Sequence, residues 1–187
     1  MPYIMYIAVQ GDDKLARFRM DPDTGKLTLQ EEIPVAGGPA PLAVDPQRRF
    51  LYVGRRGACI ISSFRIEPQT GRLTHIGEVA LASDPCYMST DRGGRFVFSA
   101  YYEAGRAAVH PIRADGVACG PPIEWLATAR GAHCMQADPS NRFVLVPHIA
   151  RFEQIRTGVD PQHQVHDVRE RHVVDVRAVP ATPANVI

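Results

Sequence analysis

The sequence predicts an all-β fold built from repeated four-stranded antiparallel sheets. The phrase DPQRRFLYVGR at 45–55 returns as DRGGRFVFSAY at 91–101 and as DPSNRFVLVPH at 138–148, at intervals of 46 and 47 residues. A second phrase, FRMDPDTGKLT at 18–28, returns 46 residues later as FRIEPQTGRLT at 64–74. The 16 prolines and 15 glycines accompany short apolar runs without helical periodicity. This combination is typical of short strands joined by tight turns.

The content of one unit decides which kind of repeat protein this is, because a period of ~40–50 residues fits a solenoid, a propeller or an array. The unit from 39 to 82 holds four apolar runs rich in β-branched and aromatic residues, which we predict to be strands: 39–44, 50–54, 59–66 and 73–81. Proline, glycine and aspartate lie between them, as tight turns require. Four antiparallel strands in ~45 residues make one blade of a β-propeller.

We therefore expect an incomplete β-propeller over residues 1–150, with about three four-stranded blades and almost no helix. The first residues, MPYIMYIAVQ, should form a strand, so that the chain starts inside a repeat. The turn phrase predicts that Arg49, Arg95 and Arg142 occupy matching positions on one face of the molecule.

Residues 151–187 do not continue this pattern. Gln164 stands where the repeat requires a glycine, and no further strand of the x-L-T type follows. We interpret 151–187 as a divergent or aberrant C-terminal segment and expect residues 165–187 to make few contacts with residues 1–150. An incomplete ring exposes two apolar blade faces and open strand edges. It must therefore self-associate through these faces, cap its ends with the C-terminal segment, or be marginally stable.

Composition excludes several classes of partner. The formal net charge is +1 and no basic stripe is present, so we expect no nucleic-acid binding. No apolar run approaches the ~20 residues of a membrane span, and the N-terminus does not resemble a signal peptide. None of the four cysteines forms a C-x-x-C pair, which favours reduced, buried thiols in a cytoplasmic protein.

The two repeated phrases, D-P-x-x-R-F followed by an apolar or aromatic residue and D-P-x-T-G-x-L-T, resemble the lactonase family of seven-bladed propellers. GAHCMQADPSNRFVLVP at 131–147 also resembles a region of that family around a histidine. The family includes the propeller-type 6-phosphogluconolactonase and the fungal carboxymuconate cyclase. The resemblance covers about residues 3–150, whereas seven blades at this period need ~320 residues.

The resemblance implies hydrolysis of a phosphorylated sugar lactone in the pentose phosphate pathway. A sister interpretation is lactone formation or opening of the carboxymuconate type. The alternative from another class is a non-catalytic propeller fragment that acts in binding.

Functional residues are expected on one loop face. The turns between first and second strands, and between third and fourth, are stereotyped. The opposite face carries variable residues, which is where function usually lies on a rigid scaffold. His133 precedes the innermost strand of the third blade and should point at the central channel. A histidine can take a proton from water or return one to a leaving group. The competing interpretation is a structural hydrogen bond to a neighbouring blade. The resemblance places His133 at the position of a catalytic-site histidine of the carboxymuconate cyclase.

The same loop face offers candidates for substrate binding. A guanidinium group suits a phosphate or a carboxylate, so Arg55, Arg56 and Arg130 could anchor an anion, unless they are solvated surface charges. Tyr101 could line a sugar site or pack between blades, and His148 lies at the same end of its strand. The expected substrate is a small anionic lactone, carrying a phosphate or a carboxylate.

No cofactor is expected, because no phosphate-loop, dinucleotide-binding, nucleophile-elbow or zinc-protease motif appears. The phrase HQVH at 163–166 invites a metal interpretation. No cysteine or ordered set of carboxylates completes such a site, so we expect no metal.

Overall fold

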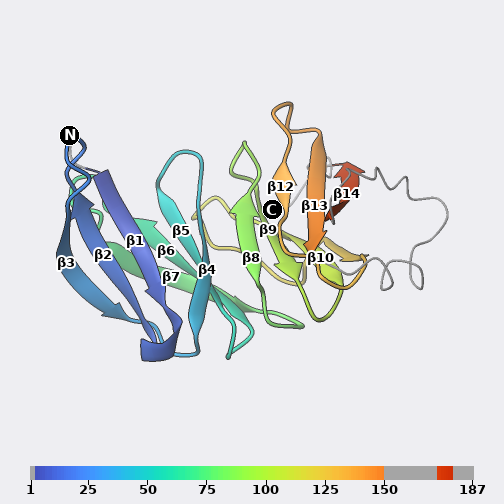
Figure 1. Cartoon of the computed structure of the whole chain (residues 1–187), viewed down its shortest axis with the longest axis horizontal. Helices are drawn as coiled ribbons and strands as arrows, with labels where there is room; N and C mark the ends of the chain where they lie inside the picture. Colours follow the sequence, from blue (N-terminus) through green and yellow to red (C-terminus); the bar gives the residue numbers. More distant parts are fainter. Residues whose placement is uncertain (1–2, 150–171, 179–187) are drawn as a thin grey trace.

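The computed structural model describes residues 3–149, together with the backbone of residues 172–178 (Figure 1). It confirms the all-β prediction. The described residues contain no α-helix, and one 3-10 turn, η1 (Gln10–Asp12), is the exception to strands and loops. Four antiparallel sheets follow one another side by side in chain order, from the blue to the orange end of Figure 1. Within the described part of the chain, no helix has the length and apolarity needed to cross a membrane.

Sheet 1 is formed by β1 (Tyr3–Val9), β2 (Lys14–Met20) and β3 (Leu27–Pro34). Sheet 2 is formed by β4 (Pro39–Val44), β5 (Phe50–Arg55), β6 (Ile60–Ile66) and β7 (Leu73–Ala80). Sheet 3 is formed by β8 (Tyr87–Thr90), β9 (Phe96–Tyr101), β10 (Arg106–Pro111) and β11 (Glu124–Ala127). Sheet 4 is formed by β12 (Gln136–Ala137), β13 (Phe143–Ile149) and β14 (His172–Ala178).

The 46-residue period of the sequence is also the period of the strands. Strands β2 and β3 span 14–20 and 27–34, and adding 46 gives 60–66 and 73–80, the bounds of β6 and β7. Sheet 1 thus contains the second, third and fourth strands of a unit, as expected for a chain that starts inside a repeat. The expectation of an incomplete propeller of four-stranded blades is confirmed: within the described residues, sheets 2 and 3 are complete four-stranded blades, and they are flanked by two three-stranded sheets.

The repeated turn has the same geometry in its three copies. The Oδ1 atom of the aspartate accepts hydrogen bonds from the backbone amides of the arginine and the phenylalanine four and five residues later. The arginine guanidinium lies over the ring of that phenylalanine, with its central carbon 5.2–5.5 Å from the ring centroid. The predicted equivalence is therefore confirmed for Arg49, Arg95 and Arg142.

The core lies between the sheets rather than at one centre, because side chains of a strand alternate between its two faces. Leu51 and Val53 of β5 pack against sheet 1, whereas Phe50 and Tyr52 of the same strand pack against sheet 3. Phe98 of β9 in turn belongs to the cluster between sheets 3 and 4. Each sheet therefore has one face for the preceding sheet and one for the following sheet.

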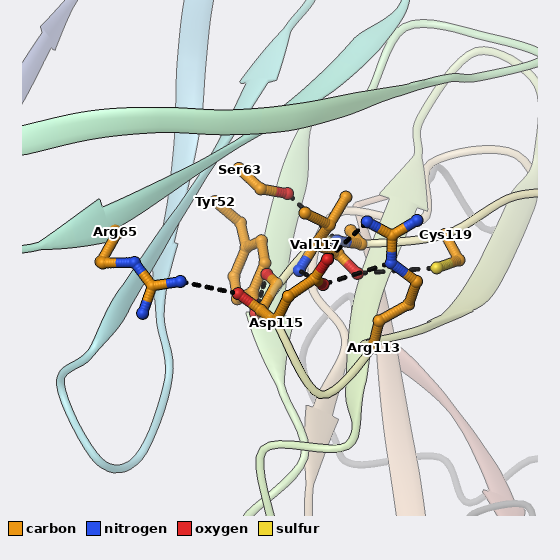
Figure 2. A network of polar contacts seen from close by, with 9 residues as sticks. Tyr52, Ser63, Arg65, Arg113, Asp115, Val117 and Cys119 are labelled. Carbon is orange, nitrogen blue, oxygen red and sulfur yellow. Dashed lines mark hydrogen bonds and ion pairs between the residues drawn. The ribbon is translucent and has the colours of Figure 1, made fainter. Parts of the chain in front are cut away.

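The connection between β10 and β11 of sheet 3 lies against β5 and β6 of sheet 2 (Figure 2). The Tyr52 hydroxyl donates a hydrogen bond to the carbonyl of Gly116 at 3.1 Å. The Ser63 hydroxyl accepts one from the amide of Ala118, also at 3.1 Å. Arg65 donates to another main-chain carbonyl of the same connection. The first two bonds satisfy buried polar groups of β5 and β6, and all three hold the connection against sheet 2.

Strand β14 corrects one expectation about the C-terminal segment. It pairs with β13 over seven residues, from Phe143 opposite Ala178 to Ile149 opposite His172. The expectation of few contacts is therefore wrong for residues 172–178. The segment HVVDVRA contains three valines, which favour extended backbone, and β13 offers it the hydrogen-bonding groups of a sheet edge. The rest of 151–187 lies outside the described residues, and the boundary at residue 150 stays a prediction.

Candidate functional site

The loops of the predicted functional face meet in two clusters, each formed by the turn after a second strand and the link that leads to the next sheet. The first cluster brings the β5–β6 turn, with Arg56, against Asp84 of the link between sheets 2 and 3. The second brings the β9–β10 turn, with Tyr102 and Glu103, against Arg130 and His133 of the link between sheets 3 and 4.

His133 is exposed and lies just before β12, the first strand of sheet 4. Its amide donates a hydrogen bond to the carbonyl of Pro147 at 3.0 Å, which ties it to β13. Its ring meets the ring of Tyr102 edge to face, with centroids 5.9 Å apart and an interplanar angle of 88°. The backbone of Tyr102 is held in turn, because its carbonyl accepts the amide hydrogen of Gly131 at 3.0 Å. His133 is thus an oriented, solvent-accessible imidazole.

Arg130 lies three residues before His133 and forms an ion pair with Glu103. Both side chains are about 60% exposed, so water competes with the pair and the net attraction is small. An exposed carboxylate of this kind can be exchanged for an incoming anion. Arg130 therefore has the chemistry of an anion-binding group in the immediate sequence neighbourhood of the histidine.

Arg55 and Arg56 are adjacent in sequence but differ in their surroundings. Arg56 donates from two nitrogens to one Asp84 carboxylate oxygen, at 3.2 and 2.6 Å, and its side chain is 37% exposed. Arg55 is only 18% exposed and already contacts the Ala36 carbonyl, the Ser62 hydroxyl and the Glu78 carboxylate. Arg55 therefore connects β5 to β6, to β7 and to the link between sheets 1 and 2, whereas Arg56 is accessible.

The Tyr101 and His148 side chains are both buried between sheets, at 0% and 1% exposure. For Tyr101 this agrees with the second of the two interpretations, packing between blades, whereas for His148 it differs from the expected substrate contact. Strand alternation gives the physical reason. Tyr101 lies four residues after Val97 on β9, and His148 lies two residues after Val146 on β13. Each side chain therefore shares a face of its strand with a buried valine. The Tyr101 ring packs edge to face on Trp125 with centroids 4.8 Å apart. Neither side chain lines a solvent-accessible surface of this structure.

The side chains of Ser99, Tyr101 and His110 form a buried polar cluster that was not predicted from the sequence. The Tyr101 hydroxyl accepts a hydrogen bond from Ser99 at 2.9 Å and lies 3.5 Å from Nε2 of His110. The other ring nitrogen of His110 lies 3.2 Å from the carbonyl of Cys119. Burial lowers the pKa of His110 and raises that of Tyr101 to about 12, so both stay neutral near pH 7. Alternation in β9 and β10 was the available signal, because it places all three side chains on one face.

Other chemistry finds little support in the described residues. Within 3–149, no three His, Cys, Asp or Glu side chains come together in a way that could hold a metal ion, and HQVH at 163–166 lies outside the described residues. The four cysteines are free thiols. A groove of about 470 Å³ runs between β7 and the β10–β11 connection, lined among others by Glu78, Arg113 and Cys119. None of the predicted site residues lines it.

Comparisons with known proteins agree with this architecture. A 6-phosphogluconolactonase of Pectobacterium carotovorum is 37% identical over 176 residues, which are 93% of this chain and 52% of that protein. The 6-phosphogluconolactonase of Pectobacterium atrosepticum is 37% identical over 147 residues, 79% of this chain and 43% of that protein. The chain spans about half the length of the curated relatives it matches.

Solved structures show the same fold. The periplasmic gluconolactonase of Pseudomonas aeruginosa superimposes with a TM-score of 0.70 at 23% identity, over 80% of this chain and 48% of that one. A structure described as a 6-phosphogluconolactonase candidate from Bacteroides fragilis gives 0.70 at 20% identity, over 79% and 46%. Residues 5–151 match the family described as "Lactonase, 7-bladed beta-propeller". The chain therefore belongs to the lactonase family of seven-bladed β-propellers.

Proposed function

We propose that this chain contributes its sheets to a propeller that hydrolyses a sugar-acid lactone, with 6-phosphogluconolactone of the pentose phosphate pathway as the favoured substrate. The observation that carries the proposal is the 37% identity with two proteins that bear the name 6-phosphogluconolactonase. The accessible histidine beside an exchangeable arginine supports it, because lactone hydrolysis needs a base and an anionic substrate needs a cation.

His133 would act as the general base. Its free imidazole nitrogen accepts a proton from a water molecule while the water oxygen forms a bond to the lactone carbonyl carbon. The tetrahedral intermediate then collapses, the bond between that carbon and the ring oxygen breaks, and the imidazolium returns its proton to the departing oxygen. The product is the open-chain hydroxy acid. The contact with Tyr102 restricts the ring orientation, which reduces the entropy lost in reaching the reactive geometry.

Arg130 and Arg56 would bind the anionic part of the substrate. Both are now paired with carboxylates, Glu103 and Asp84, in partly exposed positions. A phosphate carries more charge than a carboxylate and can accept two parallel hydrogen bonds from one guanidinium. Exchange of the carboxylate for phosphate is therefore favourable at these arginines, and unfavourable at the enclosed Arg55.

The substrate class follows as a small lactone with a phosphate or carboxylate group. For the compartment we propose the cytoplasm, supported by the four cysteines, all of which are free. The periplasmic neighbour from Pseudomonas aeruginosa is the alternative that localisation by fractionation would detect.

The proposal is tested with freshly generated 6-phosphogluconolactone, with spontaneous hydrolysis subtracted, and by calorimetric titration with the product 6-phosphogluconate. For the isolated chain we expect a low rate, because a four-sheet assembly leaves the channel hydrated, and screening by water weakens its charges. His133→Gln should lower that rate ~10²-fold, while Arg130→Gln should weaken the binding of 6-phosphogluconate. His75→Gln is the matched control, since His75 is half-exposed on β7, outside both clusters.

Turnover that survives His133→Gln would show that the base is another residue. A wild-type chain with neither turnover above background nor product binding would contradict the proposal for this chain and favour a non-catalytic role.

A further inference from the structure

Two neutral polar side chains meet between sheets 3 and 4, next to the candidate base. Tyr87 begins β8 and Gln136 begins β12, and these two strands lie side by side (Figure 1). The Nε2 atom of Gln136 donates a hydrogen bond to the Tyr87 hydroxyl at 2.7 Å. The Cys134 thiol adjoins the same hydroxyl, and Cys134 follows His133 directly in the chain. The pair therefore lies against the link that carries His133 and Arg130.

Hydrogen bonds on both sides of Tyr87 hold this arrangement in place. The Cys86 thiol donates to the carbonyl of Ala132 at 3.2 Å, and the Ser89 hydroxyl donates to the carbonyl of Met135. Both acceptors are main-chain oxygens, one before and one after the candidate base in the chain. The position of Tyr87 relative to that base is therefore fixed by the backbone and does not depend on a flexible side chain.

The repeat does not require polar groups at these two positions. Counted back from the aspartate of the repeated turn, Pro41 of sheet 2 is the counterpart of Tyr87, and Ala43 is the counterpart of Gln136. A blade therefore folds with an apolar residue at either position. Gln136 is exposed and Tyr87 is half-buried. Polar side chains that depart from the repeat and reach solvent on a rigid scaffold are candidates for ligand recognition.

The hydrogen-bonding groups of the pair suit the hydroxyl groups of a ligand. Burial raises the pKa of Tyr87 and the neighbouring Cys134 thiol adds to this, which outweighs the opposite effect of the bond from Gln136. The phenol thus keeps its proton near neutral pH and can donate it to a ligand oxygen. The amide oxygen of the exposed Gln136 can accept a hydrogen bond from a ligand hydroxyl. Because neither group is charged, the pair suits hydroxyl groups better than a phosphate or a carboxylate.

We propose that Tyr87 and Gln136 bind the hydroxyl groups of the substrate and so select a sugar-acid lactone over a carboxylate lactone that lacks hydroxyl groups. This inference rests on the proposed function, in which His133 acts on the lactone carbonyl and Arg130 binds the anionic group. A site that hydrogen-bonds a substrate hydroxyl discriminates against an analogue without it, because the polar groups of the site then lose their partner. The pair is thus a specificity determinant of the same site.

Calorimetric titration of the full 187-residue chain with two probes tests this inference. The first probe, 6-phosphogluconate, offers hydroxyl groups and a phosphate, whereas the second, inorganic phosphate, offers the anion alone. The wild type should bind 6-phosphogluconate more tightly. Tyr87→Phe and Gln136→Leu should each weaken that binding ~3- to 10-fold, as expected for one neutral hydrogen bond, and leave the Kd of inorganic phosphate unchanged. Tyr3→Phe and Gln30→Leu are the matched controls and should change neither Kd, because both side chains are exposed on sheet 1.

A pair that only holds sheets 3 and 4 together would give a different result. Tyr87→Phe would then lower the midpoint temperature of unfolding without changing the affinity for 6-phosphogluconate, and the inference would be wrong. Equal weakening of both probes would also overturn it, because the hydroxyl would then act on the anion or on the fold. If Arg130→Gln weakens both probes while Tyr87→Phe and Gln136→Leu affect neither, this inference fails and the proposed function stands. A wild-type chain that binds neither probe contradicts both.

Discussion

Removing the charge of Asp91 should destabilise the chain more than the same change at the other repeats. The Asp91 side chain is fully buried in the turn between β8 and β9. Its Oδ1 accepts the amide hydrogens of Arg95 and Phe96 at 2.5 and 2.9 Å. Its Oδ2 accepts hydrogen bonds from the Gly93 amide, the Arg95 guanidinium and the Asn141 side chain at 3.1, 3.3 and 3.1 Å. The bond from Asn141 also joins sheet 3 to sheet 4.

Asp91→Asn preserves the shape but reverses the hydrogen bonding at one oxygen. The new amide group can keep its carbonyl toward the two main-chain donors, but its NH₂ then faces three other donors. A hydrogen bond to a charged group contributes ~1.5–3 kcal/mol, and such losses within one network are not additive. We expect the free energy of unfolding to fall by ~3–5 kcal/mol, because water cannot reach the buried site to replace the lost bonds.

Urea unfolding followed by circular dichroism measures this loss, provided the transition is two-state. For a chain of this size the midpoint temperature should fall by roughly 10 °C, at ~2–4 °C per kcal/mol. Asp138→Asn is the matched control. Among the described residues, Oδ2 of Asp138 accepts hydrogen bonds from Ser140 alone, from its amide and its hydroxyl, in a more exposed turn. The loss at Asp138 should therefore be clearly smaller. Equal losses, or a loss at Asp91 below ~1 kcal/mol, the net value of one ordinary hydrogen bond, would refute the reasoning.

The pH dependence provides a second check. Burial alone would raise the pKa of Asp91, but the bonds from Asn141, Phe96, Arg95 and Gly93 together outweigh it and hold the pKa below its usual value. A carboxylate with a lowered folded-state pKa stabilises the fold above the unfolded-state pKa of ~3.9, and this contribution is lost as the pH falls through the folded value. The stability difference between wild type and Asp91→Asn should therefore be constant above about pH 5 and shrink below about pH 4.

Two further predictions follow from the packing between sheets. Gly116→Ala should lower the free energy of unfolding by more than ~2 kcal/mol, because Gly116 has φ +94° and a Cβ there would lie 2.2 Å from the Phe50 ring. Gly25→Ala is the control, since Gly25 has φ +69° but open space around it. A similar loss at both positions would show that the Phe50 contact is unimportant. Burial raises the pKa of Tyr6 and Tyr101 to about 12, so ultraviolet titration of the native chain should show part of its tyrosine absorbance change delayed well beyond pH 10. Unfolding in urea should bring that part of the titration back to the ordinary range. Because the folded state holds these tyrosines neutral, its stability should decline as the pH rises above ~10. A native titration identical to the unfolded one would contradict the burial of these side chains.

The repeat made most of the fold predictable. The predicted strands 39–44, 50–54, 59–66 and 73–81 match β4 to β7 to within a residue at each end. The C-terminal strand β14 was missed because its segment lacks the turn phrase, and its pairing depends on a partner, β13, that lies beyond a long connection.

The candidate site was predictable only in part. His133 lies exposed on the link before β12, as its place in the repeat suggested, and its catalytic role stays a prediction. Tyr101 and His148 were assigned by their position at the end of a strand, whereas the alternation of β9 and β13 directs both side chains into the core. Applying that period of two to every candidate would have separated these residues from Arg56 and Arg130.

The sequence by itself determined the period, the strands, the turns and the two-sided apolar pattern of each blade. These features depend on residues within a few positions of one another, as when Asp45 accepts the amide hydrogens of Arg49 and Phe50. Only the tertiary structure decided which charges are paired. Arg56 meets Asp84 across 28 residues, and Arg130 meets Glu103 across 27. Such contacts arise where the turn of one blade meets the link to the next. The spacing and twist of neighbouring sheets set that meeting, and both depend on how two complete apolar faces pack.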